Sequence, residues 1–210
     1  MSRNRIQADF VPLRAGPALV QRLLPQRPPF LMIDCIDAFA AGDRPAARAS
    51  RFLSANEPFF QGHFPELPLM PGALLMEGAG QTASLVYTIH AILDAYEERG
   101  ASFEQLVEDL ANLDRGFSLK PGYRVANTPL VLQAFDEVRG LPVGVAGGVR
   151  LKFLRPVTPG CRLVYEAQLT HRLEEQLRFE VTASVEGEAV LEGSIAAAIV
   201  HGLPIPGRDG

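Results

Sequence analysis

One segment of the sequence brings a histidine and a glutamate together in otherwise apolar surroundings. Residues 59–81 read FFQGHFPELPLMPGALLMEGAGQ, so His63 lies in a loop rich in proline and glycine and Glu77 follows fourteen residues later. A neutral imidazole can accept a proton, and a buried carboxyl group can hold one and donate it, because burial favours the neutral acid. The two residue types are therefore suited to a reaction in which one proton is removed and another is delivered.

The residues between them supply a third element of this chemistry. Pro71 is favourable in the first turn of a helix, and the sequence from Gly72 to about Tyr96 predicts an uninterrupted helix. Negative charge can settle on the free N–H groups at the start of a helix. A base, an acid and an oxyanion site together suit removal of a proton next to a carbonyl group with loss of a leaving group one carbon further on, which is a dehydration.

Each of the two residues also has an ordinary structural interpretation. Glu77 can be a carboxylate bonded to backbone donors or to an arginine, and His63 can be a loop histidine bonded to nearby backbone. Glu77 belongs to a polar stripe on an otherwise apolar helix, with Gln81, Ser84 and Thr88 at steps of four, three and four residues. Because buried polar groups need partners, the stripe together with His63 favours the catalytic interpretation.

The remaining sequence predicts strands that enclose this helix. Until Thr88 the helix is apolar on nearly every side, which is typical of a helix at the centre of a fold. About six strands are predicted, most of them joined by short turns. They are residues 31–39, 45–53, 148–157, 161–170, 178–185 and 189–200. Residues 1–16 are expected to be irregular, 18–24 to form a short helical turn, and 101–116 an amphipathic surface helix. These parts predict a single α+β domain over residues 1–210, with an antiparallel sheet curved around one helix.

The composition excludes several classes of protein. The 210 residues carry a formal net charge of −4, so no global basic surface is expected for nucleic acid or an anionic membrane. No segment has the apolar character of a membrane span or a signal peptide, and we expect a cytoplasmic protein. The only cysteines, Cys35 and Cys161, predict neither a disulfide framework nor a metal site. No metal and no cofactor are expected.

Four stretches of the sequence resemble the β-hydroxyacyl-[acyl-carrier-protein] dehydratases of bacterial type II fatty-acid synthesis. They are LPQRPPFLMID (24–34), NEPFFQGHFP (56–65), LMPGALLMEGAGQ (69–81) and KFLRPVTPGCRL (152–163). The resemblance implies a hot-dog fold, in which an antiparallel sheet wraps a long helix, and a homodimer with active sites shared at the subunit interface. It also implies conversion of a (3R)-hydroxyacyl thioester on an acyl carrier protein into a trans-2-enoyl thioester and water.

The same resemblance implies roles for individual residues. His63 of one chain would face Glu77 of the other, and the two would act as base and acid. The backbone N–H of Gly72 would bind the thioester oxygen, Gln81 would support Glu77, and Phe64 would belong to the substrate-binding loop. A glutamate on the helix, in place of aspartate, marks the branch of the family that does not isomerise its product.

A carrier protein is expected to be acidic, so a basic patch is expected near the entrance to the site. Arg150 and Lys152 alternate with apolar residues and should point away from the core, and Arg155 lies close to them in sequence. We take these three residues as candidates for carrier-protein docking. An ordinary solvated strand face is the alternative interpretation for each of them.

The sequence departs from the family pattern at four places. Gln26 stands where the family usually has histidine, and Glu66 replaces a common glycine after His63. GAGQ (78–81) replaces AMAQ, which makes the helix less bulky and is expected to widen the pocket. Residues 97–144 make the chain about forty residues longer than the family pattern, far beyond an ordinary connection, and are expected to be an insertion that covers the tunnel, enlarges the dimer contact or blocks higher oligomers.

Two other functions stay open. A hot-dog thioesterase also places a carboxylate on the central helix, where it activates water or attacks the thioester. A non-catalytic protein of this fold could bind acyl chains or the acyl carrier protein. The GHFP loop argues against the first alternative, and the presence of both His63 and Glu77 argues against the second. These motifs do not select between the carrier protein and coenzyme A, or among acyl chains.

Overall fold

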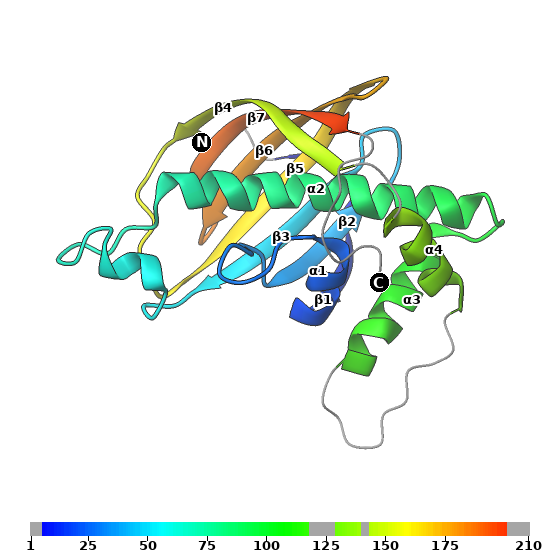
Figure 1. Cartoon of the computed structure of the whole chain (residues 1–210), viewed down its shortest axis with the longest axis horizontal. Helices are drawn as coiled ribbons and strands as arrows, with labels where there is room; N and C mark the ends of the chain where they lie inside the picture. The colour runs from blue at the N-terminus through cyan, green and yellow to red at the C-terminus, as the bar shows by residue number, and fades with distance from the viewer. Residues whose placement is uncertain (1–5, 118–128, 140–142, 201–210) are drawn as a thin grey trace.

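A seven-stranded antiparallel sheet and one long helix form the centre of the protein in a computed structural model, which describes residues 6–117, 129–139 and 143–200 (Figure 1). The strands are β1 (Val11–Ala15), β2 (Cys35–Ala40), β3 (Ala46–Leu53), β4 (Val143–Phe153), β5 (Cys161–Leu173), β6 (Gln176–Val185) and β7 (Glu188–Val200). The helices are α1 (Pro17–Leu23), the 3₁₀ helix η1 (Pro58–Gln61), α2 (Gly72–Glu97), α3 (Phe103–Phe117) and α4 (Pro129–Arg139). This is the predicted α+β hot-dog arrangement, with additional helices after α2.

The sheet has the order β1-β2-β3-β5-β6-β7-β4, so β1 and β4 form its two edges. Figure 1 shows α2 lying across one face of this sheet, with α3 and α4 gathered near the C-terminal end of the helix. The fully buried residues of α2 include Leu85, Val86 and Ile89, which belong to the same apolar core as residues of all the central strands. Burial of this apolar surface is the main force that holds the helix on the sheet.

One face of α2 is covered less completely than the sequence predicts. Glu77, Gly80, Ser84 and Ala91 are only half-buried, and Met76 keeps 37% of its surface exposed. These residues recur at helical spacing and form one side of the helix. The prediction of an enclosed helix therefore holds for most of its circumference, while the side that carries Glu77 is left partly open.

The glycine after Glu77 allows the helix to approach the sheet closely. A Cβ atom at Gly78 would lie only 2.3 Å from Cζ of Tyr165, a residue of β5 that is completely buried. The space left by Gly78 is thus filled by an aromatic ring, so this position adds no room for a pocket, and the wider pocket expected of GAGQ as a whole stays a prediction. Gly80 differs, because a Cβ atom there would meet nothing within 4 Å.

Most of the predicted strands and both predicted short helices are present, with two differences in the first forty residues. Residues 11–15 were expected to be irregular, but they form β1, which pairs with β2. The strand predicted for 31–39 begins only at Cys35. Leu31, Met32 and Ile33 are buried without belonging to the sheet, because side chains from α2 and β3 bind the backbone of this segment.

The described parts of residues 97–144 pack on the same core, to which α3 and α4 both contribute buried side chains. The amphipathic helix predicted for 101–116 is present as α3, whereas α4 and the first residues of β4 were not predicted, and residues 118–128 and 140–142 lie outside the described residues. The hydroxyl of Tyr96 in α2 donates to Oδ2 of Asp109 in α3 at 2.8 Å. Burial and this carboxylate raise the pKa of Tyr96 above its ordinary value, so the phenol stays a donor.

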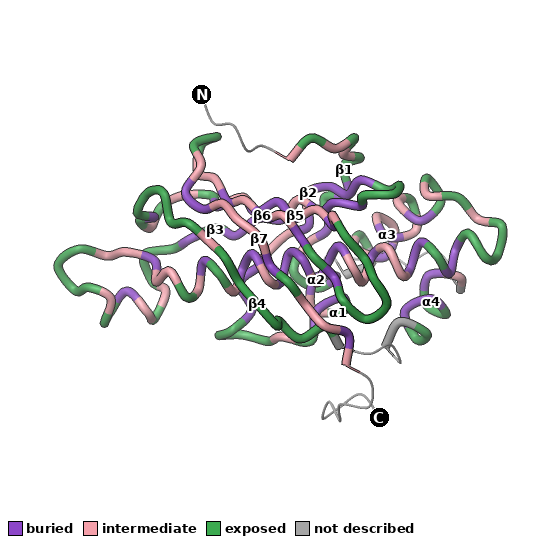
Figure 2. Tube along the Cα trace, turned by 90° about the horizontal axis from the view of Figure 1, so that it is seen from above, coloured by how far each residue is buried: buried purple, intermediate pink, exposed green. Residues whose placement is uncertain are grey.

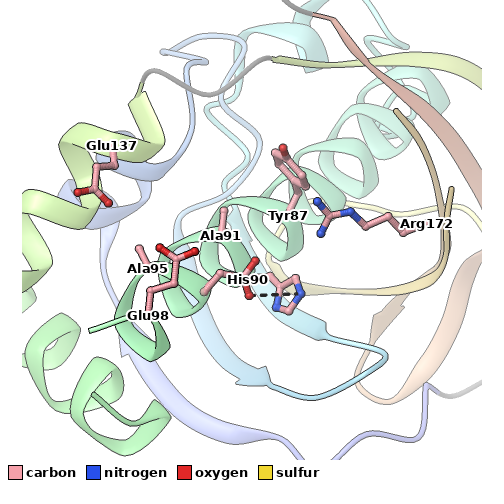
Figure 3. A pocket seen from close by; sticks show the side chains of 8 residues that line it. Tyr87, His90, Ala91, Ala95, Glu98, Glu137 and Arg172 are labelled. Atoms are coloured by element: carbon pink, nitrogen blue, oxygen red, sulfur yellow. Dashed lines mark ion pairs between the residues drawn. The ribbon is translucent and has the colours of Figure 1, made fainter. Parts of the chain in front are cut away.

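A cavity of about 240 Å³ lies between α2, α4 and the end of β5 (Figure 3). It is lined by Tyr87, His90, Ala91, Asp94, Ala95, Glu98, Glu137 and Arg172. Nε2 of His90 lies 3.8 Å from Oδ1 of Asp94. His90 follows Glu77 by thirteen residues, which corresponds to about 20 Å along the helix axis, so this cavity is separate from the predicted site.

Candidate active site

The loop that carries His63 is closed by bonds between its own ends. Nδ1 of His63 lies 3.0 Å from the carbonyl oxygen of Leu69, and the N–H of Leu69 donates to the carbonyl oxygen of His63 at 3.2 Å. The next residue, Met70, donates its N–H to Val157 at 2.8 Å, which fixes the end of the loop to the segment after β4. The loop is therefore held in place without belonging to a helix or strand.

The bond to Leu69 defines the tautomer of the neutral imidazole. Because a carbonyl oxygen can only accept, Nδ1 carries the hydrogen in this bond, and Nε2 is left with a lone pair. The ring of His63 stacks on that of Phe64 with the centroids 4.3 Å apart. His63 is half-buried, whereas Phe64 and Leu67 expose 53% and 58% of their surface. The loop thus presents a basic nitrogen beside uncovered apolar side chains.

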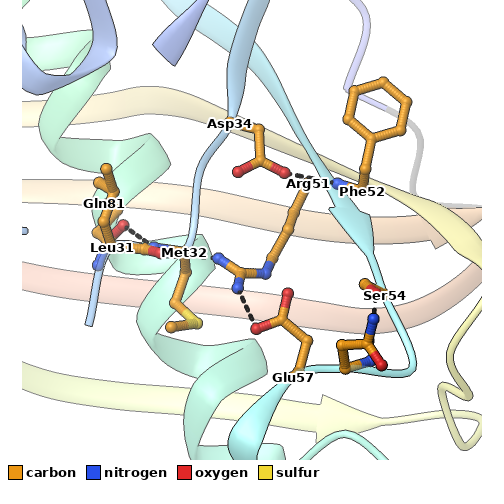
Figure 4. Close-up of polar contacts among 9 residues, drawn as sticks. Leu31, Met32, Asp34, Arg51, Phe52, Ser54, Glu57 and Gln81 are labelled. Carbon is orange, nitrogen blue, oxygen red and sulfur yellow. Dashed lines mark hydrogen bonds and ion pairs between the residues drawn. The ribbon is translucent and has the colours of Figure 1, made fainter. Parts of the chain in front are cut away.

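Glu77 is held by the amide of Gln81, one helical turn further along α2. Nε2 of Gln81 donates to Oε1 of Glu77 at 2.8 Å and to the carbonyl oxygen of Phe30 at 2.8 Å, while Oε1 of Gln81 accepts from the N–H of Met32 at 2.7 Å. A flipped amide would set two donors against each other at Met32 and two acceptors at Phe30. Gln81, which is buried, therefore has a single favourable orientation, shown with Leu31 and Met32 in Figure 4.

The hydrogen bond from Gln81 makes the two carboxyl oxygens of Glu77 inequivalent. Oε1 receives the N–H of Gln81, so a proton on the carboxyl group is favoured at Oε2. Glu77 itself is half-buried, on the partly open side of α2. The carboxyl group can therefore present one oriented oxygen to a molecule lying beside the helix.

Gly72 is the first residue of α2 and follows Pro71, which caps the helix without a side-chain bond. The N–H of a first helical residue has no acceptor within its own helix. A Cβ atom at this position would lie 3.1 Å from the ring of Phe153, the last residue of β4. Glycine therefore lets Phe153 close over the helix start, where the predicted oxyanion donor lies.

His63 and Glu77 are not joined within one chain. Among the residues that the structure describes, the polar partner of His63 is Leu69 and that of Glu77 is Gln81, and the two side chains share no hydrogen bond. Each predicted catalytic residue is thus oriented by its own local contacts. Their alignment with each other stays a prediction.

The predicted basic residues are all exposed, but they differ in their contacts. In the register of β4 and β7, Arg150 lies opposite Ser194 and Lys152 lies opposite Glu192. Arg155 forms an ion pair with Glu188. Arg150 also lines a shallow groove with Arg178 on β6. Of the three, Arg155 is the least available for a partner, because its charge is already paired. Their role in docking stays a prediction.

Neither cysteine has the environment of a nucleophile. Burial raises the pKa of both thiols, Cys35 and Cys161, which keeps them protonated. Within residues 6–117, 129–139 and 143–200, no cluster of three or more histidine, cysteine or acidic side chains is placed to hold a metal ion. None of the described helices is long and apolar enough to cross a membrane.

Sequence reasoning missed one buried charge beside the site. Arg51 on β3 is only 7% exposed, and its guanidinium binds the carbonyl oxygen of Leu31 and the carboxylate of Glu57 (Figure 4). The signal was present in the period of the strand. Ala47, Ala49, Arg51 and Leu53 alternate along β3 and therefore point to the same face of the sheet. The other three are buried, so the side chain of Arg51 is expected to point into the interior as well.

Comparison with known proteins supports this fold and identifies the family. The sequence profile of the FabA-like domain matches residues 24–111. The 3-hydroxyacyl-[acyl-carrier-protein] dehydratase FabZ of Anaeromyxobacter dehalogenans is 32% identical over 180 residues, covering 86% of this chain and 87% of that protein. The FabZ of Polynucleobacter asymbioticus is 31% identical, with coverages of 86% and 89%. Among solved structures, the dehydratase heterocomplex ApeI:P from Xenorhabdus doucetiae shares the fold, with a TM-score of 0.55, 15% identity and coverages of 92% and 93%.

The fold and the match to the FabA-like profile define a hot-dog protein of the FabA-like class. Within that class, the chain belongs to the family of FabZ-type 3-hydroxyacyl-[acyl-carrier-protein] dehydratases.

Proposed function

We propose that the protein is a hydro-lyase that converts a (3R)-hydroxyacyl thioester, carried by an acyl carrier protein, into the trans-2-enoyl thioester and water. The FabZ relatives are named for this reaction. The contacts of His63, Gly72 and Glu77 support one step of the proposed reaction for each of these residues. The glutamate at position 77 suggests dehydration without isomerisation of the product.

The reaction begins at the histidine loop. Nε2 of His63 takes the proton from C2 of the substrate, and the bond from Nδ1–H to Leu69 stabilises the imidazolium that forms. As the C2–H bond breaks, negative charge develops on the thioester oxygen. In this proposal the N–H of Gly72, aided by the helix dipole of α2, stabilises this oxygen.

The reaction ends at Glu77. The electron pair from C2 forms the C2=C3 bond as the C3–O bond breaks, and Oε2 of Glu77 delivers a proton to the departing hydroxyl, which leaves as water. The observation that carries this proposal is the locked amide of Gln81, which occupies Oε1 of Glu77 and leaves Oε2 for proton transfer. After release of the product, the proton on His63 returns to Glu77 through solvent.

A second copy of the chain is proposed to complete each site. β4 is an edge strand whose residues 144–150 are all exposed, as Figure 2 shows, and such an edge can pair with another strand. In the β4–β7 register, Val149 lies opposite Ile195 and Phe153 lies opposite Leu191, and both partners are core residues. Val149 and Phe153 therefore face the side of the sheet that carries α2, yet 44% and 55% of their surface is exposed. A partner docked along β4 would cover them and bring its His63 loop to this chain's Glu77.

The acyl carrier is proposed to approach at the same edge. Arg150 and Lys152 lie on β4, the strand whose last residue packs on the start of α2. They are suited to meet the acidic surface expected of a carrier protein, and Arg155 contributes less because Glu188 pairs with it.

Hydration of a crotonyl thioester, the reverse reaction, tests the proposal. We expect wild-type protein to consume the enoyl thioester, and His63→Ala and Glu77→Gln each to lower kcat by at least about a hundredfold, as is usual for loss of a general acid or base. Circular dichroism and size-exclusion chromatography should show that both variants keep the wild-type fold and size. Near-wild-type turnover in either variant would contradict the assigned roles.

The same samples separate dehydration from thioester hydrolysis. A dehydratase releases no free thiol, so a thiol-reactive dye should give no signal with 3-hydroxyacyl or enoyl thioester. Thiol release that depends on Glu77 would support a thioesterase instead. Binding of acyl thioesters without any turnover would support a non-catalytic binder.

A further inference from the structure

A single buried arginine connects the segments that hold the two proposed catalytic residues. The side chain of Arg51 is 9% exposed and donates in two directions: Nη1 to the carbonyl oxygen of Leu31 at 2.7 Å, and Nη2 to Oε2 of Glu57 at 2.8 Å. Figure 4 shows the guanidinium between these two groups. Isolated charges are rarely buried, because removing them from water is costly. The two contacts therefore indicate a specific task for this residue.

The first contact leads to Glu77. Leu31 lies between the two residues whose backbone holds Gln81, since Phe30 accepts from Nε2 and Met32 donates to Oε1. Arg51 binds the carbonyl group between them, so three consecutive residues of an irregular segment are fixed by side chains of α2 and β3. Any shift of this segment moves the amide of Gln81 and, through it, the carboxyl group of Glu77.

The second contact leads to His63. Glu57 is the residue that precedes η1, and its side chain is 18% exposed. The carbonyl oxygen of Glu57 accepts from the N–H of Phe60 at 3.1 Å, and the N–H of His63 donates to Phe59 at 3.0 Å. The short helix is therefore a rigid link of one turn between the carboxylate that Arg51 binds and the base.

We infer that Arg51, with Glu57, is a positioning element that fixes the loop of the proposed base relative to the proposed acid within each chain. This inference rests on the proposed dehydratase function. In a symmetric dimer the same bridge in both chains would fix both halves of every shared site. The guanidinium suits the task because its planar fork presents donors in two fixed directions, whereas a lysine ammonium lacks this geometry.

The test compares four variants with the wild-type protein. Arg51→Met removes both bonds, Arg51→Lys keeps the charge, and Glu57→Ala removes only the bond to the loop. Arg48→Met is the matched control, since Arg48 lies on the same strand and pairs with Glu166 at 2.7 Å, with no contact to either segment. Two readouts are taken: kcat and KM for crotonyl thioester hydration, and the side-chain amide signals of Gln81 in ¹H–¹⁵N spectra, assigned by their loss in Gln81→Met.

We expect Arg51→Met to lower kcat by about tenfold or more with little change in KM, because small displacements of catalytic groups are costly while the acyl-binding surface is untouched. Arg51→Lys should recover part of the loss, and Glu57→Ala should fall between Arg51→Lys and Arg51→Met. The signals of Gln81 should shift in Arg51→Met and stay unchanged in Arg48→Met. If Arg51→Met fails to fold, Arg51→Lys and Glu57→Ala carry the same comparison.

Two results would overturn the inference. One is a folded Arg51→Met with wild-type kcat and unshifted Gln81 signals. The other is an equal loss of kcat in Arg51→Met and Arg48→Met, which would mean that the loss of any ion pair on β3 has the same effect. The proposed function fails separately, if wild-type protein turns over no hydroxyacyl or enoyl thioester. In that case the Gln81 signals still decide whether Arg51 positions the amide.

Discussion

Gln81 is the residue that holds the carboxyl group of Glu77, the proposed acid, through a direct hydrogen bond. Its amide makes three hydrogen bonds in a buried position and faces each partner with the correct group. Gln81→Met keeps the length of the side chain but removes the partner of the buried N–H of Met32 and of the partly buried carbonyl oxygen of Phe30. We expect a loss of about 1–3 kcal/mol in the free energy of unfolding, the usual cost of unpaired buried polar groups, together with a fall in kcat.

Denaturant unfolding and crotonyl thioester hydration measure the two effects. Ser84→Ala is the control, because Ser84 lies on the same side of α2 and bonds only the carbonyl oxygen of Gly80 in its own helix, at 3.1 Å. Its effect should stay within about 0.5 kcal/mol, as for most changes away from buried networks. If Gln81→Met behaved like Ser84→Ala in both measurements, Gln81 would not be the support of Glu77.

The position of α2 on the sheet depends on one glycine. Gly78→Ala would force a methyl group to within 2.3 Å of the buried ring of Tyr165, and overpacking of this kind costs about 1–3 kcal/mol. Gly80→Ala, two residues along the same helix, meets open space and should stabilise the protein by up to about 1 kcal/mol through helix propensity. Thermal unfolding of the two variants gives the comparison, and Tyr165→Leu should restore part of the loss in Gly78→Ala. Equal stability of Gly78→Ala and Gly80→Ala would contradict the close contact.

The elements of this fold could be predicted where the sequence pattern is local. The helix over 72–96 follows from residue propensity, whereas the strands over 161–170 and 178–185 and the amphipathic helix over 101–116 follow from periodicity, and each is present. β1 could not be predicted in this way, because VPLRA becomes a strand only through pairing with β2. The same holds for Leu31–Ile33, whose apolar run looks like a strand but whose backbone is bound by Gln81 and Arg51.

The residues of the candidate site likewise differ in whether a local sequence pattern could identify them. His63, Glu77 and Gln81 could be selected from residue type and spacing, and the structure supplies the contacts that orient them. Arg51 and Tyr165 are joined to Leu31 and Gly78 by contacts between residues far apart in sequence, which no local pattern encodes.

At the scale of the whole molecule, a single chain leaves the proposed site incomplete. The edge of β4 is exposed, one side of α2 is partly open, and the side chains of Phe64, Leu67 and Phe153 are more than half exposed. Soluble monomers rarely leave large contiguous apolar patches exposed. We therefore predict a two-fold symmetric dimer in which the base of one chain serves the acid of the other.

Complementation between two inactive variants tests this claim most directly. His63→Ala and Glu77→Gln chains carrying different affinity tags are co-expressed and purified through both tags, which isolates the mixed dimer. If the sites are shared, one of the two sites in each mixed dimer contains an intact His63 and an intact Glu77, and we predict about half of the wild-type activity per dimer. Activity no higher than that of either parent variant, or failure to recover any doubly tagged dimer, would contradict the account.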